Sequence, residues 1–144
     1  MMRPDSQFVT AAAQGGIAEV EMGRLAVQRA SDSSVKEFGQ HMVDDHSKAN
    51  EELKTVAARK GLTAPSTVNE KEKLTIDRLS RLSGVAFDKA YMQDMVKDHQ
   101  EDVSEFKRES TKGTDSEVKA FAGKILPTLQ QHLQMAQDIA SKLK

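Results

Sequence analysis

Four long segments with helical periodicity restrict this chain to a helical bundle. In each segment the apolar residues recur at spacings of three and four, which places them in one stripe at about 100° per residue. The segments are expected at about residues 5–30, 35–60, 86–110 and 116–143, with Asp5 or Ser6 as the first N-cap and Pro127 interrupting the last segment. The sequence therefore predicts an all-α fold forming a single domain over residues 1–144.

The stretch between Gly61 and Gly84 indicates how the four helices are connected. A connector of about 24 residues is too long for a helical hairpin, where about 2–8 is usual. Residues 69–82 within it form a short amphipathic segment. Such a connector can run the length of the bundle and return the chain to its starting end. We therefore expect a ferritin-like four-helix bundle, with a crossover containing a short extra helix between helices two and three.

Composition excludes several functional classes. The chain has no cysteine, which rules out disulfides, thiolate zinc sites and cysteine catalysis. A net charge of −1 with interspersed signs offers no basic patch for nucleic acid. No apolar run approaches the roughly 20 residues that span a bilayer, so no transmembrane segment is expected. The N-terminus has no apolar signal core; if the natural protein is exported, its signal has already been removed from this sequence.

Three of the four histidines fall in the apolar stripes of three different segments. These are His46, His99 and His132, whereas His41 lies about 100° from the stripe of its own segment. In the first segment, Glu19 lies within the stripe. With the crossover connection, Glu19, His46 and His132 lie about 16 Å from the shared end of the bundle, and His99 about 20 Å. Because buried charge is costly unless it is paired or metal-bound, the sequence predicts one metal site formed by Glu19 and the three histidines.

Three aspartates are expected around these ligands. The pattern Met-Val-x-Asp-His occurs twice, and its aspartates, Asp45 and Asp98, point about 100° away from the adjacent histidine, toward a neighbouring helix. There each could accept the second N–H of an imidazole and orient the ligand, or serve as an ordinary interface residue. Asp102 shares the stripe of His99.

Four methionines lie one helical turn from the predicted ligands: Met22, Met42, Met95 and Met135 stand beside Glu19, His46, His99 and His132, respectively. Met42 precedes His46 and Met95 precedes His99 by four residues. Thioethers beside imidazoles suit a soft ion such as Cu(I), but methionine is also a common core filler. The methionines therefore leave the choice between zinc and copper undecided.

Five stretches of the chain resemble a known bacterial family. They extend across nearly the whole sequence: Gly16–Ala26, Met42–His46, Phe87–Tyr91, Met95–His99 and Leu126–Leu133. The family is a ferritin-like domain of unknown function, usually exported and often labelled a predicted outer membrane protein. The resemblance implies a four-helix bundle with a periplasmic or envelope location, and it brings no established activity.

The residues before the histidines argue against a di-iron centre. Ferritin-like di-iron sites use two Glu-x-x-His pairs and two further glutamates. Here Val43, Val96 and Leu129 stand three residues before the inward histidines, so none supplies a glutamate. A single ion of borderline or soft character fits better, with zinc expected first, copper next and iron less suited.

Three functions follow as hypotheses. The first is a metal-binding protein of the periplasm or envelope, with one buried zinc or copper ion. The second is a ferritin-like oxidoreductase with a degenerate centre, in which Asp45 and Asp102 supply the missing oxygens. The third is a structural or interaction module without metal, whose histidines are hydrogen-bonding core residues. No motif of another enzyme class stands out, which favours binding over catalysis, and the sequence does not decide whether the chain forms a homo-oligomer.

Overall fold

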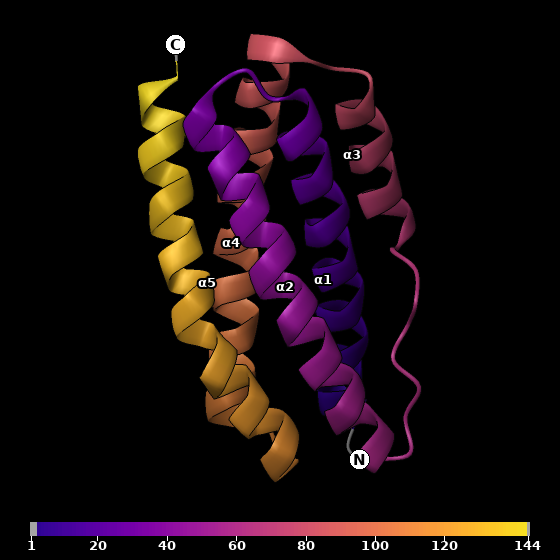
Figure 1. The fold of residues 1–144 in the computed structure, drawn as a ribbon. Helices are drawn as coiled ribbons and strands as arrows, with labels where there is room; N and C mark the ends of the chain where they lie inside the picture. The colour runs from indigo at the N-terminus through magenta and orange to yellow at the C-terminus, as the bar shows by residue number, and fades with distance from the viewer. Residues whose placement is uncertain (1–2, 144) are drawn as a thin grey trace.

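The computed structural model describes residues 3–143, which form two long helix pairs and one short helix. The first pair is α1 (Arg3–Arg29) and α2 (Ser33–Arg59), and the second is α4 (Gly84–Lys112) and α5 (Ser116–Lys142). The short helix α3 (Glu70–Ser80) lies in the connector between the pairs and packs beside α1 (Figure 1). Residues 1, 2 and 144, which the predicted domain includes, lie outside the described part.

The connector makes α2 and α4 parallel, which confirms the predicted crossover. In Figure 1 the chain leaves α2 at one end of the bundle and returns through α3 to the end where α2 begins. There, buried Asp88 of α4 accepts backbone hydrogen bonds from Ser31 and Asp32 in the α1–α2 turn, at 3.1 and 3.0 Å. At the opposite end, buried Asp5 of α1 accepts one from the backbone of Thr114 in the α4–α5 turn, at 3.2 Å. Each pair thus anchors the turn of the other.

The helix boundaries lie close to the predicted ones, and local chemistry explains the differences. α1 begins two residues early because Pro4 is tolerated in a first helical turn. The expected N-cap at Asp5 or Ser6 is therefore wrong, since both residues lie inside α1. α3 starts after Asn69, whose side chain forms a capping box with Glu72. α5 continues through Pro127 without ending. Among the described residues, no helix is both long enough and apolar enough to cross a bilayer.

Two facing glycines allow α1 and α2 to approach closely. A Cβ built on Gly39 would lie 2.6 Å from the Cβ of Ala26 and 2.8 Å from the carbonyl oxygen of Gly23. A side chain at position 39 would therefore push the two helices apart. The contact sets the rotation of α2, and His46, seven residues later, lies on the same face.

A polar layer separates two apolar clusters in the interior. The cluster nearer the α1–α2 turn includes Phe38, Met42, Tyr91 and Met95. The cluster nearer the α4–α5 turn includes Leu53, Phe106, Phe121 and Leu129. Between them each long helix contributes one buried polar side chain: Glu19, His46, His99 and His132. These side chains form the layer in which the candidate site lies.

Candidate metal centre

The three inward histidines converge at the centre of the bundle. His46 of α2, His99 of α4 and His132 of α5 are 7%, 0% and 1% exposed. One ring nitrogen of each lies within 4.8 Å of a nitrogen of both others. An ion central to the widest such triangle would lie about 2.8 Å from each nitrogen, whereas an imidazole binds zinc at about 2.0–2.1 Å. Side-chain shifts below an ångström would therefore complete a three-coordinate site.

Hydrogen bonds orient two of the three rings. Nδ1 of His99 lies 2.9 Å from the backbone oxygen of Met95, so Nδ1 carries the proton, because a carbonyl oxygen only accepts. The lone pair of His99 is thus on Nε2. His132 directs its Nε2 to a carboxylate oxygen of Asp45 at 2.7 Å, which leaves the lone pair on Nδ1. A second-nitrogen hydrogen bond of this kind is typical of histidines that bind metals.

The nitrogens that carry these lone pairs have no other partner. Within residues 3–143, Nε2 of His99 and Nδ1 of His132 are buried without a hydrogen bond, and so is Nε2 of His46. Burying an unpaired polar atom costs about 1–3 kcal/mol. Three such atoms in one layer therefore represent a substantial cost to the folded chain.

All three imidazoles are neutral at neutral pH. Burial lowers the pKa of His46 well below its ordinary value, and the neighbouring His99 and His132 lower it further. Burial and His132 lower the pKa of His99 to about 4. Burial also lowers the pKa of His132, outweighing the opposite effect of Asp45. Neutral imidazoles retain the lone pairs that a metal ion requires.

Glu19 lies beside the triad but belongs to a different set of ligand atoms. It is 3% exposed, and its Oε2 is buried without a hydrogen-bond partner in the described chain. One of its oxygens lies within 4.8 Å of ligand atoms of both His99 and Asp102. Burial raises the pKa of Glu19 well above its ordinary value, and the Asp102 carboxylate raises it further. The structure thus arranges the four predicted ligands and Asp102 as two sets that share His99. One set is His46, His99 and His132, and the other is Glu19, His99 and Asp102.

The other residues predicted around the site occupy different surroundings. Asp45 accepts the hydrogen bond from Nε2 of His132. Asp98 instead lines a groove on the side of the bundle where α3 packs. There burial, followed by the charge of Asp94, raises the pKa of Asp98 to about 6. Met42 and Met95 are fully buried in the apolar cluster on one side of the triad.

One residue at the site was not predicted from the sequence. The ring of Phe38 packs edge-on against His99 and His132, with centroids 6.2 and 6.5 Å apart. It therefore closes the histidine layer on the side of the first apolar cluster. Phe38 stands eight residues before His46 on the same apolar stripe, and this spacing could have indicated that its ring lies next to the histidines.

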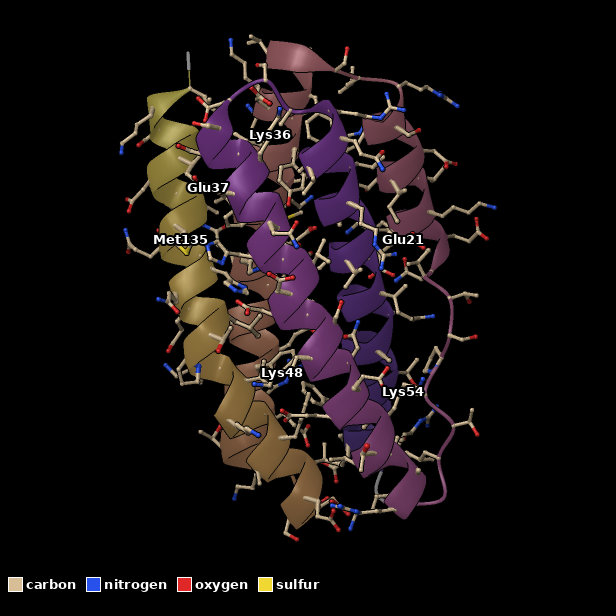
Figure 2. The ribbon with its side chains drawn as sticks, in the orientation of Figure 1. Glu21, Lys36, Glu37, Lys48, Lys54 and Met135 are labelled. Carbon is tan, nitrogen blue, oxygen red and sulfur yellow. The ribbon has the colours of Figure 1, made fainter. Side chains whose placement is uncertain are left out.

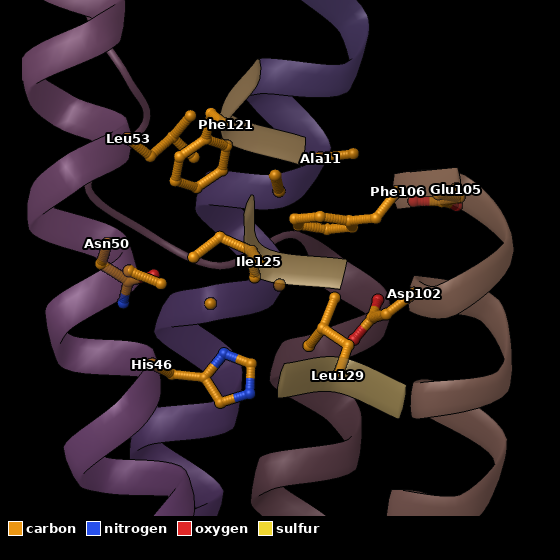
Figure 3. A pocket seen from close by; sticks show the side chains of 14 residues that line it. Ala11, His46, Asn50, Leu53, Asp102, Glu105, Phe106, Phe121, Ile125 and Leu129 are labelled. Carbon is orange, nitrogen blue, oxygen red and sulfur yellow. The ribbon is translucent and has the colours of Figure 1, made fainter. Parts of the chain in front are cut away.

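A small cavity lies beside His46 on the other side of the layer. Its volume of about 30 Å³ is close to that of one water molecule. In Figure 3 the His46 ring and the Asp102 carboxylate extend toward it from α2 and α4, and Asn50 also lines it. The cavity thus offers space and polar partners for one small ligand next to the triad.

Nearly the whole chain matches a known family. The family model described as "Domain of unknown function (DUF4142)" covers residues 1–139. The chain belongs to the DUF4142 family. This membership confirms the resemblance to a family without established activity. No curated protein matches this DUF4142 chain.

Solved structures share the fold of this DUF4142 chain at low identity. A DUF305 fragment from Deinococcus radiodurans has a TM-score of 0.85 and 14% identity, covering 99% of this chain and 98% of its own. A DUF305 protein from Streptomyces coelicolor, named a candidate secreted protein, has a TM-score of 0.81 and 16% identity, with coverages of 96% and 91%. CopM in its Cu(I)-bound form has a TM-score of 0.76 and 18% identity, with coverages of 93%. At these identities the likeness establishes the fold.

Proposed function

We propose that this DUF4142 protein binds a single metal ion at His46, His99 and His132, with copper favoured over zinc. The observation that carries the proposal is the convergence of three neutral, buried imidazoles whose free nitrogens have no partner among residues 3–143. A metal ion would supply the missing partner of all three nitrogens at once. A merely structural role would leave three unpaired polar atoms together in the core, which natural proteins seldom retain.

The charge of the triad favours copper. Its three ligands are neutral, and a monovalent soft ion loses less hydration energy than a divalent ion when it enters a buried neutral site. Zinc, expected first from the sequence, would need a fourth ligand such as Glu19 or a water molecule. CopM, which shares the fold, is known in Cu(I)-, Cu(II)- and Ag-bound forms, and this likeness also supports copper.

The proposed location is the bacterial periplasm or envelope. Two observations support it: the resemblance to a family that is usually exported, and the shared fold of the Streptomyces coelicolor protein named a candidate secreted protein. In that setting the proposed role is to hold a metal ion rather than to catalyse a reaction.

A ferritin-like oxidoreductase is the second candidate. The grouping of Glu19, His99 and Asp102 supports it, because carboxylate oxygens with one imidazole suit iron. Asp45, expected to supply a further oxygen, is engaged with His132 instead. Rapid oxygen consumption on addition of Fe(II) would favour this candidate over simple metal binding.

The test compares two histidines of one helix. Cu(I) and Zn(II) affinities of the untagged protein are measured by competition with chromogenic chelators, for wild type, His46→Ala and His41→Ala. His41 is exposed on α2, so His41→Ala is a matched control. We expect His46→Ala to weaken Cu(I) binding more than about 100-fold, because outer partners of ligands alone contribute about 10–100-fold. We expect His41→Ala to have little effect. Equal effects of the two variants, or no binding of either ion by wild type, would refute the proposal.

A further inference from the structure

An acidic groove opens to solvent between α1, α3 and α4, next to the histidine layer. Its volume is about 190 Å³. Among its described lining residues, Lys71 is the one basic side chain. Six carboxylates line the same space: Glu19, Glu72, Asp98, Glu101, Asp102 and Glu105. The groove therefore gathers acidic side chains with little compensation from basic ones.

The inner end of this groove carries an unpaired buried carboxylate. Glu19 lines the groove, yet it is 3% exposed, and its Oε2 has no hydrogen-bond partner in the described part of the chain. Oxygens of Glu19 and Asp102 and a nitrogen of His99 lie within 4.8 Å of one another. A buried carboxylate without a donor is costly unless a cation faces it. This second observation separates the inner end of the groove from an ordinary acidic surface.

We infer that Glu19, Asp102 and His99 form a second cation position, which takes a hard divalent ion such as Mn(II) from the groove. Two carboxylates and one imidazole, with further carboxylates toward solvent, provide mainly the oxygen ligands that such ions prefer. The histidine triad offers only nitrogen, so the two positions select different ions. The inference rests on the proposed function only through the shared ligand His99.

Sharing His99 makes the two positions compete. Its Nδ1 is engaged with the backbone oxygen of Met95, so only Nε2 is free, and one lone pair serves one ion at a time. An ion held by His46, His99 and His132 therefore removes one ligand from the carboxylate position. Repulsion between the two cations acts in the same direction. Loading the triad should weaken Mn(II) binding.

The test measures Mn(II) binding to the full-length protein by electron paramagnetic resonance of the free ion. We expect one tight Mn(II) per chain, and a loss of affinity of more than about tenfold in both Glu19→Gln and Asp102→Asn. Glu101→Gln is the matched control, because Glu101 lines the same groove but is exposed. These amide variants keep the size of each side chain, and circular dichroism checks that they fold. A loss in Glu101→Gln equal to that in Asp102→Asn would show diffuse surface attraction and overturn the inference.

A second arm separates this inference from the proposed function. Saturation with Ag(I), a redox-inert substitute for Cu(I), should weaken Mn(II) binding more than about tenfold in wild type, because His99 is withdrawn. In His46→Ala, Mn(II) should still bind while the effect of Ag(I) is lost. Mn(II) binding that responds to Asp102→Asn in a protein that takes up no Cu(I) would support the carboxylate position and refute the triad. The inference would be overturned if the Mn(II) affinity were unchanged in both amide variants, or unchanged when Ag(I) is bound at the triad.

Discussion

Acidification should destabilise the metal-free protein through His99. Burial and His132 lower its pKa to about 4 in the folded state, whereas an unfolded histidine titrates at about 6.5. Between these values the unfolded chain binds the proton more readily, so the free energy of unfolding falls as the pH decreases from about 6.5 toward 4. Proton linkage with these two pKa values gives a loss of about 2 kcal/mol between pH 7.5 and pH 5 from His99 alone.

The comparison with His99→Asn isolates this contribution. Asparagine can retain an N–H donor toward the backbone oxygen of Met95 but does not titrate. Buried Glu19 and Asp102 act with the opposite sign, since burial raises their pKa values, and the comparison largely cancels their effect. In urea unfolding with a chelator present, wild type should lose about 2 kcal/mol more than the variant between pH 7.5 and pH 5. Equal losses in the two proteins would refute a buried neutral His99.

Four further substitutions test the site and the contacts that hold the helices around it. Asp45→Asn should weaken Cu(I) binding about 10–100-fold in the chelator competition, because His132 loses its orienting carboxylate. Gly39→Ala should lower the free energy of unfolding by about 1–3 kcal/mol, since the new methyl group meets α1. Gly123→Ala, whose Cβ would make only an ordinary contact at 3.7 Å, should raise it by about 0.5–1 kcal/mol. Asp88→Ala removes three hydrogen bonds from the α1–α2 turn and should cost about 3 kcal/mol, measured by urea unfolding.

Helical periodicity predicted correctly that Glu19 and the three histidines point inward. The period is rigid, so residues two or five positions apart on one helix face different surroundings. Glu19 is buried while Glu21, labelled in Figure 2, is exposed, and His46 is buried while His41 is exposed. The length of the connector likewise predicted the parallel arrangement of α2 and α4, because about 24 residues are too many for a helical hairpin and enough to run back along the bundle.

Contacts between helices could not be predicted in the same way. The stripe of α4 holds both His99 and Asp102, and it is the rotation of α4 against α1 that brings Glu19 near both of them. Glu72 faces the acidic groove because α3 docks against α1, which its own amphipathic pattern does not specify. Asp5 bonds to the turn 109 residues away, a pairing without a local sequence signal.

The division of ligands between the two helix pairs has a kinetic consequence. His46 comes from the α1–α2 pair, whereas His99 and His132 come from the α4–α5 pair. An ion bound by all three would tie the pairs together at mid-height, and its release would require the pairs to separate locally or the buried rings to rotate out. The residence time of the ion would then be set by the opening rate of the bundle rather than by diffusion. Slow opening of the bundle would therefore favour retention of a bound ion over rapid exchange.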